Sequence, residues 1–250
     1  MRYFLKISYK GTNYHGWQIQ PNALTIQQVF NEKLSLILGE EIYCIGCGRT
    51  DTGVHAKEFY LHFDTTKAFS GNIKYRLNSF LPNDIAVHEI FTVADEETNA
   101  RWSAVERSYE YIISQKKDPF SQELAAQIFY NLDIEKMNEA AQILLEYQEY
   151  QGLSKINEQE KHHLCDIRFA KWENQPDDKL MFTITANRFL RGMVRIVVGS
   201  LLEIGRGKKD VNWLREVIES KDCRKAGSAA PAEGLYLSKV IYPDGLLVKL

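Results

Sequence analysis

The sequence predicts an α+β protein made of two ferredoxin-like halves, each a split βαβ unit with an antiparallel or mixed sheet. Two observations predict this class. The 250 residues suffice for one large domain or two small ones, at roughly 150 residues per domain. Strand-like alternation and helical hydrophobic spacing then follow one another as β-α-β-β-α-β in each half, with one extra helix in the second. The order repeats while the residues do not, and we expect two domains, 1–104 and 105–250.

In the first half, alternation of apolar residues over 2–9 predicts a strand. Thr25 and Gln28 form a capping box that begins a helix over 26–38, and Gly39 ends this helix. The remaining elements are expected as a short strand near 41–47, a strand near 57–64, a helix over 72–80 and a strand over 85–93.

The second half opens with an expected strand over 108–114. Asp133 is expected to cap the helix that follows it, and Asp210 to cap the extra helix. Hydrophobic spacing predicts a long helix over 189–204, and the segment 174–178 is expected to be a hairpin loop. The remaining strands are expected at 165–174, 179–187 and 234–242.

Composition excludes several classes of protein. Hydrophobic residues make up 44% and charged residues 26%, a globular balance that excludes a disordered chain. The net charge of −2 excludes a histone-like excess of positive charge but leaves room for a local basic groove. Arg2 and Lys6 interrupt the apolar start of the chain, so no signal peptide is expected, and no run reaches the ~18 apolar residues of a membrane span. We therefore expect a cytoplasmic protein that does not bind membranes, with four reduced cysteines.

The most informative segment is 48–55, because two glycines flank a single acid there. Glycine permits backbone shapes that other residues resist, so a tight loop can present the Asp51 carboxylate outward. Arg49 lies two residues away, and a neighbouring cation favours the ionised form of a carboxyl group. An ionised, held carboxylate can serve as a nucleophile. The alternative is an ordinary surface turn, because Gly, Asp and Thr are common turn residues.

Cys44 and Cys47 form a C-x-x-C motif, which invites a zinc or redox interpretation. A structural zinc site needs two more ligands at compatible spacing, and the other two cysteines are single and distant. We favour small buried strand residues for this pair. Asp51, His55 and His62 lack a recognised ligand spacing, so no metal site is expected from them.

Arg188, Arg191 and Arg195 recur at helical spacing beside the apolar stripe of the predicted 189–204 helix. The line of Arg195 continues into apolar residues, so its side chain is expected to be partly buried. A buried arginine requires a carboxylate partner, for which Asp51 is one candidate. The alternative is a solvated basic face, because arginine stems often lie along apolar surface while their charged ends stay in water.

Two further segments are candidates for RNA contact. A basic cluster at 206–209 could contact phosphates, although such runs are usually solvated loops. Tyr109 and Tyr111 share one face of the predicted 108–114 strand. Strand tyrosines usually belong to the core, but one at the edge of a cleft could stack on a base.

Taken together, these segments resemble the tRNA pseudouridine synthase A family, the TruA family. The resemblance spans nearly the whole chain in the family's order. It rests on the segments 9–21, 25–27, 48–56, 81–85, 100–104, 107–111, 189–195 and 230–237, and on Asn78, Gly199 and Leu201. One block departs from the family pattern, at 149–154, where most changes are to similar residue types.

The resemblance implies conversion of uridine to pseudouridine at positions 38, 39 and 40 of the tRNA anticodon stem-loop. It also implies a pseudouridine synthase fold with two α+β halves around a central basic cleft, a homodimer, and no metal or organic cofactor. By resemblance, Asp51 is the catalytic nucleophile, Tyr109 contacts the target base, Arg195 pairs with Asp51 and Arg49 supports the flipped nucleotide. The net charge then predicts that acidic surface, such as 96–97 and 177–178, offsets the basic cleft.

Two other functions compete with this one. Ferredoxin-like halves also occur in RNA-binding modules without chemistry, but these use aromatic sheet motifs and have no need of an acidic loop between glycines. A thiol or zinc protein built on Cys44 and Cys47 is the other, and stoichiometric zinc would revive it.

Overall fold

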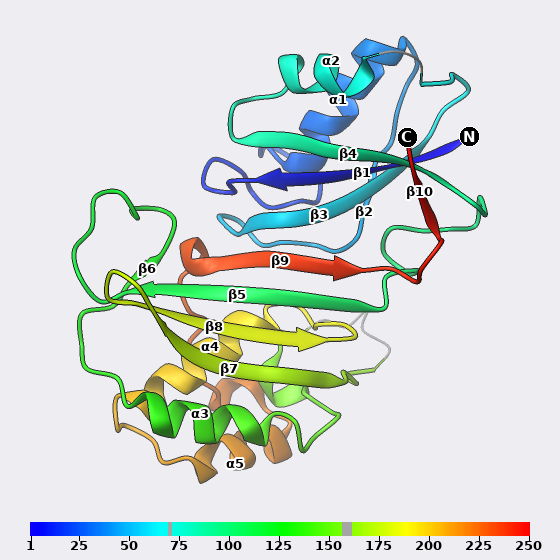
Figure 1. Ribbon diagram of the computed structural model, residues 1–250. Coiled ribbons are helices and arrows are strands. Elements are labelled where there is room, and N and C mark those ends of the chain that lie inside the picture. Colours follow the sequence, from blue (N-terminus) through cyan, green and yellow to red (C-terminus); the bar gives the residue numbers. More distant parts are fainter. Residues whose placement is uncertain (70–71, 157–161) are drawn as a thin grey trace. The chain divides into compact units, whose positions relative to one another are not determined.

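The computed structural model describes residues 1–69, 72–156 and 162–250. Packing divides the chain into two compact units, the first made of Met1–Arg107 and Tyr236–Leu250 and the second of Ser108–Leu235. Each unit combines helices with strands (Figure 1), which confirms the predicted α+β class. The expected domains, 1–104 and 105–250, stay a prediction.

The first unit is built on a mixed sheet. Its strands follow the order β10-β4-β1-β3-β9, and β2 pairs with β3. The pairs are antiparallel except for β3 with β9, which run parallel from His55 opposite Tyr236. The bounds are β1 Arg2–Tyr9, β2 Ile45–Gly46, β3 His55–Asp64, β4 Ile85–Val93, β9 Leu235–Ile241 and β10 Leu247–Lys249. The strand expected near 41–47 is thus only two residues long, and β10 was not expected.

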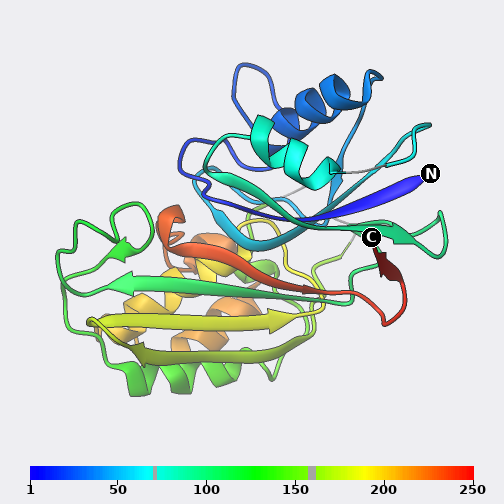
Figure 2. The same cartoon turned by 45° about the horizontal axis from the view of Figure 1, so that its top comes forward.

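Two helices cover this sheet, and Figure 2 shows them lying together. They are α1, Ile26–Leu38, and α2, Ile73–Phe80. The Thr25 side chain accepts the amide of Gln28, and Gly39 closes α1 with a left-handed φ of 64°. The Gln28 side-chain amide donates to Glu32 at 2.9 Å, one turn further along α1.

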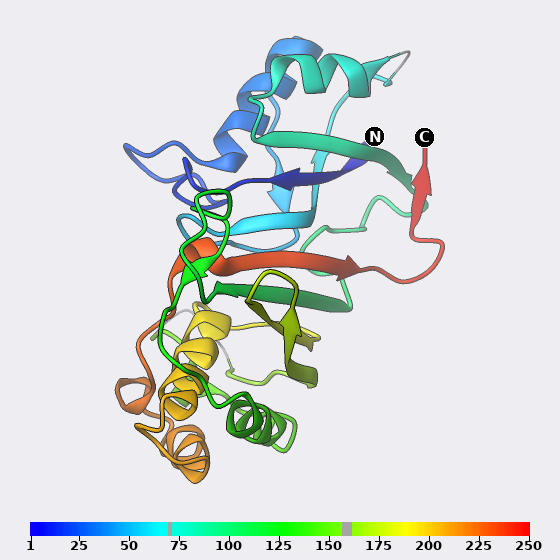
Figure 3. The same cartoon turned by 60° about the vertical axis from the view of Figure 1, so that its left-hand side comes forward.

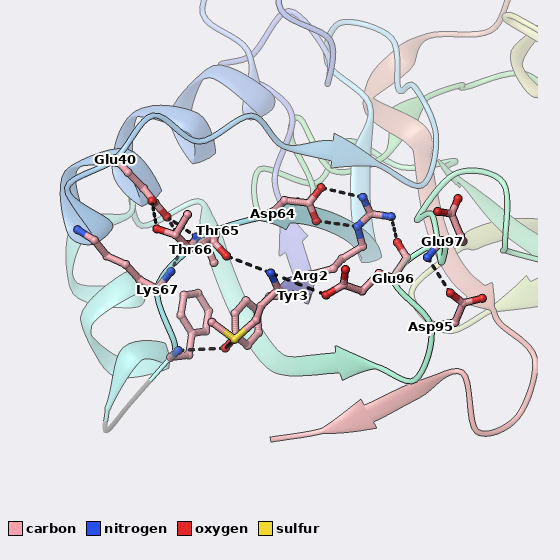
Figure 4. Close-up of polar contacts among 12 residues, drawn as sticks. Arg2, Tyr3, Glu40, Asp64, Thr65, Thr66, Lys67, Asp95, Glu96 and Glu97 are labelled. Atoms are coloured by element: carbon pink, nitrogen blue, oxygen red, sulfur yellow. Dashed lines mark hydrogen bonds and ion pairs between the residues drawn. The ribbon is translucent and has the colours of Figure 1, made fainter.

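The register of β1 against β3 determines which end of the sheet carries the 48–55 loop. Arg2 lies opposite Asp64, and Tyr9 lies opposite Ala56. Figure 4 shows the first of these ends, where the Arg2 guanidinium donates to both Asp64 carboxylate oxygens, at 2.8 and 2.7 Å. The same guanidinium also donates to the carbonyl of Thr98 at 2.9 Å. The end at Tyr9 is therefore the one that meets residues 48–55.

The second unit contains the sheet order β5-β8-β7, with β6 parallel to β5. The bounds are β5 Glu106–Ser114, β6 Ala126–Gln127, β7 Ile167–Gln175 and β8 Lys179–Ala186. The predicted hairpin loop between β7 and β8 is confirmed. Gln175 pairs with Lys179, so the loop consists of the three residues 176–178, and Asp177 and Asp178 both have positive φ there, 61° and 53°. The strand β6 was not expected, because two residues carry no readable alternation.

The helices of this unit gather on one side of β7 and β8 (Figure 3), and α3 contacts β7, α4 and α5. Their bounds are α3 Ile134–Ile143, α4 Met193–Gly205 and α5 Asn212–Ser220, with short 3-10 turns at Gln151–Leu153, Cys223–Lys225 and Ala232–Gly234. Asp133 caps α3 as predicted, and Asp210 accepts the amide of Trp213 at the start of α5. Across 1–69, 72–156 and 162–250, no helix is long and apolar enough to cross a membrane.

The predicted start of the 189–204 helix is wrong. Gly192 adopts a left-handed φ of 66° and caps α4, so the helix begins at Met193. Consequently Arg188 and Arg191 do not belong to the helix, and the predicted stripe of three arginines along one helical face does not exist. Only Arg195 lies on α4.

Candidate active site

Asp51 opens a tight turn, as the flanking glycines predict. Its carbonyl accepts the amide of Val54 at 3.1 Å, and Gly53, the third residue of the turn, has φ of 78°. A positive φ at this place in a β-turn favours glycine strongly. Asp51 is half-buried and Arg49 is exposed, and both lie in the short connection between β2 and β3. The turn therefore fixes the backbone at the residue that carries the carboxylate.

Residues 9–17 form a cradle around this loop. The amide of Trp17 donates to the carbonyl of Thr50 at 3.3 Å, and the amide of Gly53 donates to the carbonyl of Tyr14 at 3.2 Å. At Gly16, where φ is 80°, a Cβ would lie 2.3 Å from the Thr50 carbonyl oxygen. This contact leaves no space for a side chain, so glycine is required where the cradle passes residue 50.

Two buried side chains reinforce the cradle. The Tyr9 hydroxyl lies 2.9 Å from the Thr50 hydroxyl. The amide of Gly11 donates to Nδ1 of His55 at 3.0 Å, and the His55 ring stacks on Tyr236 with centroids 4.7 Å apart. His55 thus uses a ring nitrogen as a structural acceptor.

The start of the loop is anchored by Arg107. Its guanidinium donates to the carbonyls of Cys47 at 3.1 Å, Ala104 at 3.0 Å and Arg101 at 2.6 Å. Cys47 directly precedes Gly48, so these bonds fix the strand end from which the loop departs. In the sequence, Arg107 stands out only as part of a family segment, since no local spacing connects it to residue 47.

Arg195 is half-buried, as predicted, and is fixed to the segment before β9. Its Nε donates to the carbonyl of Ala230 at 2.7 Å, and the amide of Ala230 donates back to the Arg195 carbonyl at 2.9 Å. The approach is close, because a Cβ at Gly199 would lie 1.8 Å from the Ser228 carbonyl oxygen. These bonds orient the guanidinium. The predicted pairing of Arg195 with Asp51 joins residues of different units and stays a prediction.

Tyr109 and Tyr111 lie on β5 two residues apart. Tyr111 is fully buried and donates its hydroxyl to the Pro231 carbonyl at 2.9 Å, whereas Tyr109 is half-buried. The rings of Tyr109 and Phe189 pack edge to face, with their centroids 5.1 Å apart. Tyr111 therefore belongs to the core, and Tyr109 is the tyrosine of this pair that retains exposed surface.

The C-x-x-C motif is buried on and beside β2. Burial raises the pKa of both thiols, Cys44 and Cys47, well above their ordinary value. The backbone of Cys47 also pairs with Tyr60, its amide donating to the carbonyl at 2.7 Å. Among the residues that the structure describes, no group of three or more His, Cys, Asp or Glu side chains could hold a metal ion.

The basic cluster at 206–209 is largely paired within its own unit. Arg206 and Lys208 lie 3.4 and 3.6 Å from carboxylate oxygens of Glu203, and Lys209 lies over the Trp213 ring. A phosphate that bound here would compete with Glu203 for two of the cations.

The departing block at 149–154 is well packed. Tyr150 is fully buried and donates its hydroxyl to the carbonyl of Tyr147 at 2.7 Å. Gly152 lies against α5, because a Cβ there would be 2.3 Å from the Val217 carbonyl oxygen. The altered residues thus form a compact turn against α5.

Comparisons with known proteins agree with the resemblance. A family described as tRNA pseudouridine synthase matches residues 140–243. The tRNA pseudouridine synthase A of Parabacteroides distasonis is 44% identical over 98% of this chain and 97% of its own length. That of Porphyromonas gingivalis is 41% identical over 99% of both chains, and that of Myxococcus xanthus is 35% identical over 96% of this chain and 92% of its own.

Proposed function

The chain belongs to the tRNA pseudouridine synthase A family, a family of isomerases, and we propose that it converts uridines of the tRNA anticodon stem-loop, at positions 38, 39 and 40, to pseudouridine. The observation that carries this proposal is identity of 41–44% to synthases over essentially the whole chain, which includes the loop around Asp51. The local geometry supports it, because that loop holds a half-buried carboxylate in a turn with a fixed backbone.

The reaction exchanges one bond of the uracil base for another. The bond from N1 to C1′ of the ribose breaks and a bond from C5 to C1′ forms. The proton on C5 leaves to solvent, and N1, freed from the ribose, takes up a proton, so the product is an isomer of the substrate. Nothing is oxidised and no water is added, so the residues need only activate, hold and reposition the base. We propose that Asp51 assists as an ionised carboxylate, either by attacking the nucleotide or by removing a sugar proton.

Three further residues complete the proposed site. The target base must leave the stack at a cost of a few kcal/mol, and stacking in the pocket offsets this cost. Tyr109 suits that role because it retains exposed surface and its edge-on contact with Phe189 restrains its ring. Arg195, oriented by Ala230, is proposed to pair with Asp51, and the exposed Arg49 to support the flipped nucleotide.

The remaining features of the proposal rest on the family. They are two ferredoxin-like halves, one carrying the Asp51 loop and the other Tyr109 and Arg195, a basic cleft that binds tRNA phosphates, a homodimer and a cytoplasmic location. Phosphate contacts predict that tRNA affinity falls steeply as salt rises.

The test is release of tritium from tRNA labelled at uridine C5, in EDTA, by the wild type and by Asp51→Asn. Release by the wild type alone, with tRNA binding retained by the variant, supports a synthase with Asp51 at its centre. Turnover by Asp51→Asn would refute the assigned role. If neither protein releases tritium while both bind tRNA, the activity itself is refuted. Mapping pseudouridine in the product tRNA then tests positions 38, 39 and 40.

A further inference from the structure

The turn opened by Asp51 has a support that none of the proposed site residues supplies. The amide of Gly53, two residues after Asp51, donates to the carbonyl of Tyr14 at 3.2 Å. The position of Tyr14 therefore sets one of the backbone contacts that hold the turn. Tyr14 itself is only 3% exposed.

The side chain of Tyr14 is fixed by Asp84. Its hydroxyl donates to one carboxylate oxygen of Asp84 at 2.6 Å, and the Asn13 side-chain amide donates to the other at 3.3 Å. The amide of Lys10 donates to the Asp84 carbonyl at 2.9 Å. Burial and the adjacent Asp84 raise the pKa of Tyr14, so its phenol stays a donor at any pH at which the protein works. Hydrogen bonds to a carboxylate are roughly twice as strong as neutral ones.

The Asp84 carboxylate is not needed for the local turn in which it lies. Residues 82–85 lead into β4, and the amide of Ile85 donates to the carbonyl of Pro82 at 3.0 Å without a side chain taking part. The carboxylate reaches instead across 70 positions of sequence to Tyr14. Its contacts thus serve the cradle around the Asp51 loop.

We propose that Asp84 is a positioning residue for the Asp51 carboxylate, acting through Tyr14 and the Gly53 amide. This inference rests on the proposed function, in which Asp51 is the catalytic group. Asp84 fixes Tyr14, Tyr14 fixes the third residue of the turn, and the turn sets the direction of the Asp51 side chain.

The expected consequence is a loss in turnover rather than in binding. The Tyr9–Thr50 and Gly11–His55 contacts hold the loop independently of Asp84, so the fold survives its removal. A displacement of about 1 Å at a reacting group can cost about 100-fold in rate. The contacts described here for Asp84 lie within the protein, so KM for tRNA is expected to change little.

The experiment compares five variants with the wild type in the tritium-release assay, one of them a control. Tyr14→Phe and Asp84→Ala are expected to lower kcat about tenfold or more, with KM within about twofold of wild type. The double variant is expected to be no slower than the worse single one, because both changes remove the same contact. Asp84→Asn retains an amide oxygen that accepts from Tyr14 and is expected to recover most of kcat. The matched control is Tyr3→Phe, which removes another buried phenol hydroxyl, the acceptor of the Phe69 amide at 3.1 Å (Figure 4).

A second readout follows the hydrogen bond from the Gly53 amide to the Tyr14 carbonyl directly. Hydrogen exchange of the Gly53 amide is expected to be about tenfold faster in Tyr14→Phe and unchanged in Tyr3→Phe. An active wild type with unchanged kcat in Asp84→Ala, or a kcat for Asp84→Asn as low as that of Asp84→Ala, overturns the positioning role. A wild type that releases no tritium overturns the proposed function, and the positioning role falls with it.

Discussion

The Tyr9 hydroxyl lies 2.9 Å from the Thr50 hydroxyl, and both side chains are buried. The pair joins the last residue of β1 to the residue directly before Asp51. A buried hydroxyl that loses its partner destabilises a fold by about 1–3 kcal/mol, whereas loss of both partners costs much less. This hydrogen bond thus couples the sheet to the loop.

The losses of stability on removing the two hydroxyls are not expected to add, because the first removal already breaks the hydrogen bond between them. Tyr9→Phe and Thr50→Val should each lower the free energy of unfolding by about 1–2 kcal/mol, and the double variant by less than their sum. Urea unfolding of the four proteins measures this directly. Strict additivity would show that the two hydroxyls act independently and would contradict the hydrogen bond.

Gly199 is predicted to tolerate no side chain. A Cβ there would lie 1.8 Å from the Ser228 carbonyl oxygen, which is backbone and must shift. Gly199→Ala should lower the free energy of unfolding by about 3 kcal/mol, despite the better helix propensity of alanine. The control is Gly48→Ala, where a Cβ meets nothing within 4 Å. Equal stability of the two variants in thermal or urea unfolding would contradict the tight packing of α4 on 227–230.

Arg195→Lys is predicted to impair catalysis despite the retained charge. Lysine has no planar guanidinium and cannot make the Nε bond to Ala230 while presenting a second donor edge. Loss of a charge-assisted bond of about 1.5–3 kcal/mol corresponds to about a 10–100-fold fall in kcat/KM. Arg191→Lys is the matched control, because Arg191 is exposed and lies outside α4. Equal kcat/KM for both variants would remove Arg195 from the site.

Helix ends that are marked by a capping side chain or a capping glycine could be predicted from the sequence almost to the residue. Thr25 and Gly39 delimit α1 because each acts on its own neighbours, through a side-chain acceptor and a left-handed φ. The start of α4 was missed for a related reason. Apolar periodicity continues through Leu190, but Gly192 takes a left-handed φ that interrupts the helix, and periodicity does not report φ.

The features of the candidate site likewise fall into those that local sequence predicts and those that depend on residues far apart in the sequence. The tight turn at Asp51 follows from the flanking glycines, which act locally. The cradle does not follow from any local pattern, because Tyr14 meets Asp84 across 70 positions and Arg107 meets Cys47 across 60. Such pairs depend on the register of β1, β3 and β4, which single-sequence periodicity leaves open.

The cysteines are predicted to differ sharply in reactivity. All four carry thiols; Cys44, Cys47 and Cys165 are buried and Cys223 is partly exposed. The thiolate is the reactive form, and burial disfavours it. A thiol reagent should therefore modify one cysteine per chain, Cys223, in the native protein and all four after unfolding. Mass spectrometry of the labelled peptides checks this. Rapid labelling of Cys44 or Cys47 in the native state would reopen the redox interpretation of the C-x-x-C motif.

Stability is predicted to fall with pH below neutrality because of His62. Burial, and secondarily Arg2, lower the pKa of His62 to about 4, against the opposing effect of Asp64. Its Nδ1 accepts the amide of Ala100 at 3.0 Å, which requires that this nitrogen carry no proton. In the unfolded chain the pKa is about 6.5, so between pH 6.5 and 4 the unfolded state binds more protons than the native state. His62 therefore contributes stability that is complete above about pH 6.5 and is lost as pH falls towards 4, by up to about 3 kcal/mol.

His62→Asn separates this effect from the other titrating groups. The asparagine oxygen can accept the amide of Ala100 in place of Nδ1, and it does not ionise in this range. Urea unfolding between pH 4 and 7 should then show a smaller loss of stability at low pH than in the wild type. NMR of the ring carbons should show no titration of His62 between pH 5.5 and 8, because its folded pKa lies well below that window. A midpoint near 6.5 would mean that the ring reaches water, and the acid sensitivity would then belong to other groups.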